Sequence, residues 1–107
     1  MSETKELTRP LIDALNQTGG MALRMNSGVI RLPGRTIKLH DKGTADILFF
    51  PRCCPPVKFA RTPTWIETKI GKYGQDLDQR IFQLKVEALG HRYILVTSID
   101  EGLEALR

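Results

Sequence analysis

The fold is decided by residues 64–96, which read TWIETKIGKYGQDLDQRIFQLKVEALGHRYILV. Residues 64–70 predict a strand, the helical spacing of apolar residues at 76–89 predicts a helix, and the apolar run 93–96 predicts a further buried strand. A helix that crosses between two strands of one sheet makes those strands parallel. The chain is therefore expected to have an α/β fold.

The residues before this stretch predict a helix followed by short strands. The β-prone runs 21–25, 29–32 and 36–39 indicate successive antiparallel strands, 46–50 a buried strand, and 51–63 an irregular excursion. Pro10 belongs in the first turn of the helix or kinks it. The helix itself is indicated by three leucines at helical spacing and by a Gly-Gly pair that can end it: Leu7, Leu11 and Leu15, then Gly19 and Gly20.

The residues after position 75 complete a layered domain. Asp76 and Asp78 favour the start of the second helix, and Gly90 ends it. Ser98 and Glu101 have the spacing of a capping box that opens a short closing helix. A mixed sheet flanked by helices, formed by residues 1–107 as one domain, is the economical arrangement. The main apolar stripe of the second helix consists of Leu77, Ile81, Leu84 and Ala88.

Composition limits the class of protein. The chain has 107 residues, of which 41% are apolar, enough for one core. No apolar run approaches the roughly 18 residues of a membrane span, and the polar start does not resemble a signal peptide, so a cytoplasmic protein is expected. The net charge of +4 suits a polyanionic partner but also occurs in proteins that bind none. Cys53 and Cys54 are expected to be reduced thiols in a loop.

The strand at 64–70 carries the first candidate chemistry. Its period of two places Trp65, Glu67 and Lys69 on one face, and Ile66, Thr68 and Ile70 on the other. Taken alone, a Glu-x-Lys pair is most often a solvated ion pair.

Asp46 changes that interpretation because it opens a run of four apolar residues, where a carboxylate is costly without a partner. Two acids and a lysine could then meet at adjoining strand ends. Such a group suits phosphodiester hydrolysis, because carboxylates hold a hard cation and a lysine can orient the nucleophile. The ordinary alternative for Asp46 is a cap or turn residue after Gly43 and Thr44.

Several motifs follow one another along nearly the whole chain: a first helix at 7–15, Asn26-Ser27-Gly28, Gly43-Thr44-Ala45-Asp46, Glu67-Thr68-Lys69, a helix from Gln79 to Gly90, and a strand and helix within 93–106. In this order they resemble the virus-type replication-repair nuclease (VRR-NUC) domain of the PD-(D/E)xK superfamily. The resemblance implies a restriction-endonuclease-like core.

The resemblance also implies roles for individual residues. Asp46 and Glu67 would ligate Mg²⁺ or Mn²⁺ with the backbone carbonyl of Thr68, Lys69 would position or polarise the attacking water, and Gln79 would complete the site. An exposed, solvated glutamine remains the alternative for Gln79. The implied activity is endonuclease cleavage of branched DNA, such as Holliday junctions, by a homodimer.

This chain departs from the family pattern in three places. Ala45 stands where the family usually has proline, and residues 51–63 form a long insertion. The family generally carries an acidic residue on the first helix, whereas the helical register places Thr4 there, with Glu3 and Glu6 on either side. Glu3 or Glu6 is the candidate that would complete the metal site.

Basic and aromatic residues suggest how DNA could be held, and two other functions compete. Tyr73 and Lys72 lie in a turn beyond Lys69 and could touch a base or phosphate, although an ordinary exposed turn is the simpler interpretation. A phosphate-tracking patch or a solubilising face could be formed by Arg24, Arg31, Arg35 and Lys38. The rival functions are an inactive DNA-binding module with the same fold and an RNA-binding protein, which would leave the acidic strand ends unexplained.

Overall fold

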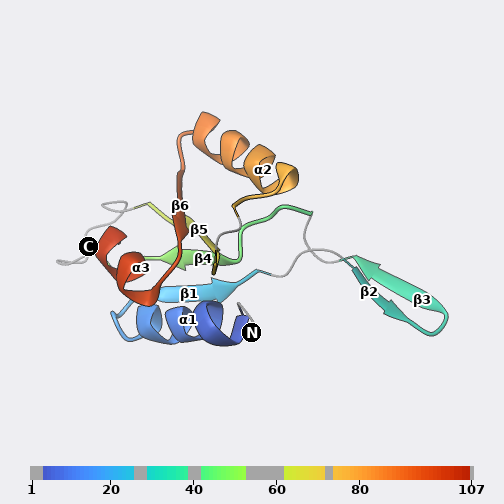
Figure 1. Cartoon of the computed structure of the whole chain (residues 1–107), viewed down its shortest axis with the longest axis horizontal. Helices are drawn as coiled ribbons and strands as arrows, with labels where there is room; N and C mark the ends of the chain where they lie inside the picture. Colours follow the sequence, from blue (N-terminus) through green and yellow to red (C-terminus); the bar gives the residue numbers. More distant parts are fainter. Residues whose placement is uncertain (1–3, 26–28, 39–41, 53–61, 72–73, 107) are drawn as a thin grey trace.

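The computed structural model describes residues 4–25, 29–38, 42–52, 62–71 and 74–106. Figure 1 shows the order of the elements along the chain. They are the π-helical turn η1 (Thr4–Thr8), α1 (Arg9–Asn16), β1 (Met21–Arg24), β2 (Val29–Leu32), β3 (Arg35–Lys38), β4 (Ile47–Phe50), β5 (Thr64–Thr68), α2 (Leu77–Ala88), β6 (Arg92–Val96) and α3 (Ile99–Ala105).

Four strands form one mixed sheet in the order β1-β4-β5-β6. The pairs β1/β4 and β4/β5 are antiparallel, and β5/β6 is parallel. Because α2 crosses between β5 and β6, the parallel pair predicted from residues 64–96 is confirmed, and so is the mixed sheet of an α/β protein.

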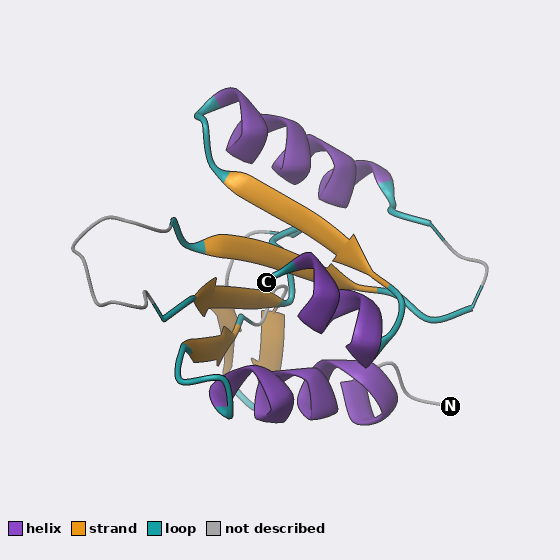
Figure 2. Ribbon diagram, turned by 90° about the vertical axis from the view of Figure 1, so that its left-hand side faces the viewer, coloured by secondary structure: helices purple, strands orange, loops and turns teal. Residues whose placement is uncertain are grey.

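Helices cover both faces of this sheet (Figure 2). On one face α1 and α3 bury a core that includes Leu11, Ile47, Ile66 and Val96. On the other face α2 packs over β5 and β6, where Trp65, Phe82, Val86 and Tyr93 surround the fully buried Ala45. The Phe82 ring meets the Trp65 ring edge-on at a centroid distance of 5.1 Å. Adjacent residues of β5 thus belong to different cores, as strand alternation requires.

The predicted run of successive antiparallel strands is only partly correct. β2 and β3 do pair antiparallel, from Val29–Lys38 to Leu32–Arg35, but as a separate hairpin that stands apart from the main sheet (Figure 1). β1 pairs with β4 instead of β2, and this pairing continues in a hydrogen bond of 2.7 Å from Met25 N to Asp46 O. The hydrogen-bonding edge of β1 is therefore occupied by a strand more than twenty residues away.

The apolar stripe of α2 does not face the core. Leu77, Ile81 and Leu84 are exposed, whereas Phe82 and Val86 pack against the sheet. The reason is that two aromatic rings, Trp65 and Tyr93, line the sheet under α2, and Phe82 contacts both of them. Aromatic side chains bury large apolar areas, and these ring contacts hold α2 with Phe82 facing the sheet.

The predicted helix ends are largely confirmed. Pro10 lies in the first turn of α1, and Gly19, with φ +92°, follows the end of that helix in the left-handed region. Ser98 Oγ caps α3 by accepting from Glu101 N, while the Glu101 carboxylate accepts from Thr97 N and Oγ1 rather than from Ser98. Among the residues that the structure describes, no helix has the length and apolar character needed to cross a membrane.

Gly43 brings the chain before β4 against the start of α2. It is buried, its φ is +92°, and a Cβ added there would lie 2.4 Å from Asp78 O. Both the backbone conformation and the contact demand glycine. Gly43 therefore sets the distance between the Asp46 strand and the helix that carries Gln79.

Gly43→Ala is expected to lower the free energy of unfolding by about 2–4 kcal/mol, because strain and overpacking add. The matched control is Gly90→Ala, which has a similar φ of +86° but no atom within 4 Å of the added Cβ. It should cost only the strain, about 1–2 kcal/mol. Urea unfolding of the two variants measures the difference, and equal losses would show that the contact with α2 is unimportant.

Candidate metal centre

Asp46 and Glu67 lie at the adjoining ends of neighbouring strands. Asp46 directly precedes β4, Glu67 is the penultimate residue of β5, and the register pairs their neighbours Ile47 and Ile66. The negative charges of both carboxylates act on the buried phenol of Tyr93. Two like charges brought near one another repel, and a cation between them would offset that repulsion.

Thr68 holds the Asp46 carboxylate. Asp46 Oδ2 accepts hydrogen bonds from Thr68 N at 2.9 Å and from Thr68 Oγ1 at 2.8 Å. A side-chain oxygen thus replaces the strand carbonyl that would normally accept from this N–H, and the ladder ends there. Both of these hydrogen bonds go to Oδ2.

A second hydroxyl extends this contact to the first helical segment. Thr8 Oγ1 lies 2.6 Å from Thr68 Oγ1, and Thr8 and Thr68 are both buried. Because the Thr68 hydroxyl donates to Asp46, the Thr8 hydroxyl must donate to Thr68. The first helical segment therefore reaches the site through a neutral threonine, in a chain of hydrogen bonds that orients Asp46.

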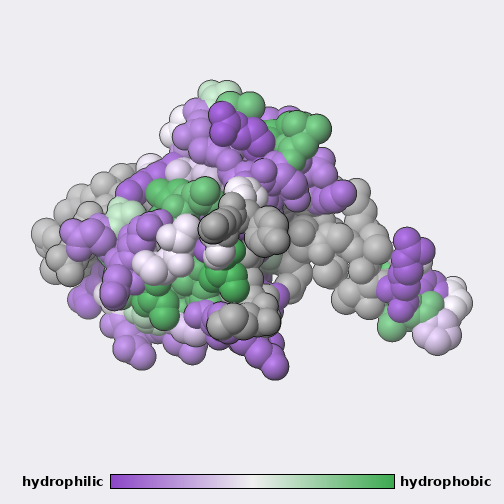
Figure 3. Space-filling model, viewed as in Figure 1, coloured by the Kyte–Doolittle hydropathy of each residue, from purple (hydrophilic) through white to green (hydrophobic). Residues whose placement is uncertain are grey.

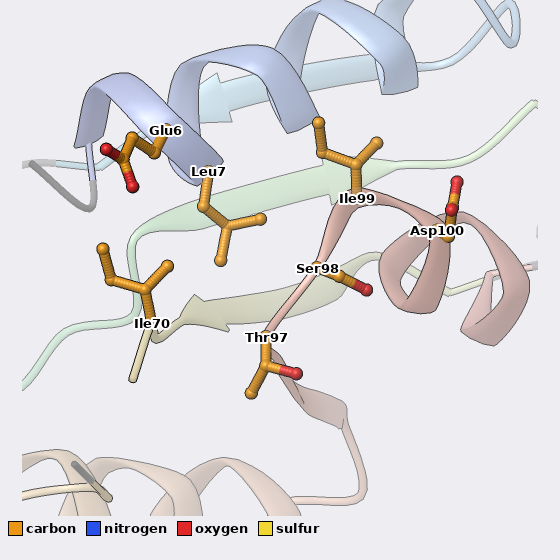
Figure 4. Close-up of a pocket in the computed structure, with 7 residues that line it drawn as sticks. All are labelled: Glu6, Leu7, Ile70, Thr97, Ser98, Ile99 and Asp100. Carbon is orange, nitrogen blue, oxygen red and sulfur yellow. The ribbon is translucent and has the colours of Figure 1, made fainter. Parts of the chain in front are cut away.

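The acidic candidates on this segment lie elsewhere or outside the described residues. Glu6 is exposed and lines a hollow with Leu7, Ile70 and residues 97–100 (Figure 4). No hydrogen bond or ion pair joins Glu6 to Asp46 or Glu67. Glu3 and the side chain of Thr4 are not among the described parts of the chain.

Glu67 is almost fully buried, with 1% of its surface exposed. Its Oε1 accepts from Gln79 Nε2 at 3.0 Å, and its Oε2 is likewise shielded from solvent. Glu67 is therefore not part of a solvent-exposed ion pair. Burying an ionised carboxylate is costly unless nearby donors or a cation compensate. Such buried carboxylates are typical of functional sites rather than of surface ion pairs.

The cap of α2 fixes the side chain of Gln79. Asp76 Oδ1 accepts from Gln79 N at 2.9 Å, and Gln79 Oε1 accepts from Asp76 N at 3.0 Å, which completes a capping box. With Oε1 so engaged, Nε2 points at Glu67. The half-buried Gln79 thus contacts the site, and the Asp-x-x-Gln spacing that orients it was visible in the sequence.

Gln79→Glu separates the role of this side chain in capping α2 from its role as a hydrogen-bond donor to Glu67. Glutamate at this position preserves the capping box, but it removes the donor to Glu67 and adds a second negative charge beside it. Without metal, the free energy of unfolding is expected to fall by about 1–3 kcal/mol. Mg²⁺ should then raise the melting temperature of the variant more than that of the wild type. An equal magnesium effect in both proteins would contradict the contact between Gln79 and Glu67.

Tyr93 is a neighbour of the site that the sequence did not reveal. Burial raises the pKa of its phenol well above the usual value, and the charges of Glu67 and then Asp46 raise it further, against a hydrogen bond from Gln75 that lowers it. Gln75 Nε2 donates to the phenol oxygen at 2.9 Å. Both carboxylates therefore act on one ring, which stays protonated at neutral pH and retains a hydrogen to donate.

Lys69 directly follows β5 and keeps its backbone in the sheet, since its N–H donates to Val96 O at 3.0 Å. Strand alternation carries its side chain toward the face of Glu67. Among the described residues its ammonium forms no ion pair. The Thr68 carbonyl points to the β4 side of its strand, as the Thr68 N–H does, and so toward Asp46.

The donor set suits Mg²⁺ or Mn²⁺ rather than a softer metal. Within the described ranges, no three His, Cys, Asp or Glu side chains gather into a metal-binding group. Mg²⁺ is usually held by one or two carboxylates and keeps several waters, so Asp46, Glu67 and the Thr68 carbonyl could hold this cation.

Several sequence candidates lie away from this centre or cannot be placed. Arg31 and Arg35 are exposed on the separate hairpin. Arg24 is also exposed, but it pairs with Ile47, the residue that follows Asp46. Those that fall outside the described residues are Cys53, Cys54, Lys72, Tyr73, the side chain of Lys38 and the turn 26–28.

No protein-family model, curated protein or solved structure matches this chain.

Proposed function

We propose that this protein is a Mg²⁺- or Mn²⁺-dependent endonuclease of the VRR-NUC type, which hydrolyses phosphodiester bonds in DNA. The observation that carries the proposal is the meeting of Asp46 and a buried Glu67 at adjoining strand ends, next to Lys69. Branched DNA, such as a Holliday junction, is the substrate that the family resemblance favours.

Each residue would have a distinct part in the reaction. Asp46, Glu67 and the Thr68 carbonyl would hold the cation. When bound, the cation would supply Lewis-acid activation of water and neutralise charge on the phosphate. Lys69 would orient the attacking water and stabilise the developing negative charge.

The remaining contacts would hold these groups in place. The hydroxyls of Thr8 and Thr68 restrain Asp46, and Gln79 restrains Glu67. Such preorganisation matters because a site that must rearrange during the reaction loses much of its electrostatic stabilisation.

The charge distribution supports a DNA partner. The net charge is +4, and the hairpin of β2 and β3 presents Arg31 and Arg35 to solvent, apart from the main sheet. Exposed arginines on a projecting two-stranded ribbon can contact phosphates or enter a groove. A homodimer, also implied by the resemblance, would supply two centres for cutting two strands.

The test is cleavage of linear, flap and four-way-junction DNA by the purified chain with Mg²⁺, with Mn²⁺ and with a chelator. We expect cleavage only with metal, and its loss in Lys69→Ala. If the wild type binds DNA but never cuts it with either metal, the protein is instead a DNA-binding module with this fold. Cleavage that persists in the chelator would contradict the metal-dependent mechanism.

A further inference from the structure

The outer face of α2 carries an apolar stripe that nothing in the described chain covers. Leu77 is 74% exposed, Ile81 41% and Leu84 55%, and Ala88 continues the row at the same helical spacing. Figure 3 shows green apolar patches over α2 among hydrophilic neighbours. The helix is anchored from its other side by Phe82 and Val86, so the stripe is not needed to hold α2 on the sheet.

Charges of both signs flank the stripe in a specific order. Asp78 and Lys85 lie along one side of it, and Arg80 and Glu87 along the other. In heptad terms the apolar residues occupy a and d positions, and the four charged residues occupy the e and g positions that select a partner helix.

We propose that this face of α2 binds the same face of a second copy of the chain, as an antiparallel helix pair about a twofold axis. In that arrangement Ile81 of one copy lies against Leu84 of the second copy, and Leu77 lies against Ala88 of the second copy. A twofold interface is self-complementary, so each contact occurs twice. The inference deepens the homodimeric part of the proposed function, on which it rests, but it is tested separately from the nuclease chemistry.

Charge complementarity selects the antiparallel orientation. Antiparallel helices oppose e with e positions and g with g positions. Asp78 then faces Lys85 of the second copy, and Arg80 faces Glu87 of the second copy, which pairs opposite charges on both sides of the stripe. A parallel pair would set Arg80 against Lys85 of the second copy, a repulsive contact. Asp78 already forms an ion pair with Lys42 at 3.4 Å, but that pair is exposed to solvent. Asp78 can therefore interact with Lys85 of the second copy as well.

An exposed leucine of β1 provides a matched control. Leu23 of β1 is 40% exposed, on a part of the sheet that α2 does not cover. It is not part of the apolar stripe of α2. Leu84→Gln and Leu23→Gln make the same chemical change at comparable exposure. Only the first should affect a dimer formed through α2.

Sedimentation velocity of the full chain across the micromolar range tests the proposal. We expect a wild-type dimer, a dissociation constant at least about tenfold weaker in Leu84→Gln, and no change in Leu23→Gln. A wild-type monomer throughout the range would overturn the proposal. So would a dimer that Leu23→Gln weakens and Leu84→Gln does not, because the sheet face would then be the interface.

Swapping the charges at positions 80 and 87 distinguishes loss of the dimer contact from unfolding of the variant. Arg80→Glu should weaken the dimer because it sets two acids opposite each other, and Arg80→Glu combined with Glu87→Arg should restore it. The two positions are seven residues apart and on one helix, too far for a direct pair within one copy. If the double variant is as weak as the single one, the antiparallel pairing is wrong. DNA cleavage is measured in parallel, so that a failed dimer and a failed nuclease are told apart.

Discussion

Asp46→Asn is expected to abolish metal-dependent cleavage while the chain stays folded. The amide oxygen of asparagine can still accept from Thr68 N and Thr68 Oγ1, so the local hydrogen bonds persist. The charge that attracts the cation is lost, however, and a bound cation is worth several kcal/mol in the transition state. We expect the single-turnover rate to fall by roughly a thousandfold, with the free energy of unfolding changed by about 1 kcal/mol or less.

Asp13→Asn is the matched control for this experiment. Asp13 is an exposed acid of α1, so its amide variant alters the net charge equally and leaves the candidate centre intact. Its cleavage rate should equal that of the wild type. If Asp46→Asn cuts DNA at the wild-type rate, Asp46 does not belong to the reaction centre.

Glu67→Gln is expected to stabilise the protein without metal and to remove the response to metal. Glu67 is 1% exposed and lies at a strand end adjoining Asp46, so its charge is costly in the metal-free chain. Glutamine keeps an oxygen for Gln79 Nε2 but removes the charge. The free energy of unfolding in a chelator should therefore rise by roughly 1–3 kcal/mol, while cleavage and stabilisation by Mg²⁺ are lost.

Two further measurements make this prediction specific. Because the Glu67 charge helps to raise the pKa of Tyr93, the pKa of this phenol should fall toward its usual value in Glu67→Gln, as an ultraviolet titration would show. The control Glu104→Gln changes an exposed glutamate of α3 and should leave the magnesium response unchanged. A loss of stability in Glu67→Gln would mean that the buried carboxylate serves the fold rather than a cation.

The elements of the fold were largely predictable because they depend on local rules. Helical spacing located α1 and α2, Gly19 and Ser98 marked helix ends, and the crossover of α2 determined that β5 and β6 are parallel. The pairing of β1 with β4 was not predictable in this way. Strand pairing depends on which edges meet in space, and the pattern of a strand does not name its partner.

The face of α2 illustrates the same limit. Its apolar stripe has the clearest helical spacing of apolar residues, yet Phe82 and Val86 are the residues that pack inward. Periodicity indicates that a helix has an apolar face but cannot weigh that face against aromatic partners supplied by other elements. Trp65 and Tyr93, from two separate strands, decided the rotation of the helix.

The residues of the candidate centre divide along the same line. The sequence by itself determined that a carboxylate opens the apolar strand β4 and that Glu67, Thr68 and Lys69 alternate along β5, because these properties depend on local order alone. Only the tertiary structure decided that Asp46 and Glu67 lie at adjoining strand ends.

Contacts between distant segments were likewise decided only by the fold. Thr8 is linked to Asp46 through Thr68, which lies sixty positions after Thr8 in the chain. The charges of Glu67 and Asp46 both raise the pKa of Tyr93. A hydroxyl or a phenol has no periodicity that marks it for such a contact. Its role arises from burial and from the neighbours that packing supplies, and these exist only once the strands and helices have come together.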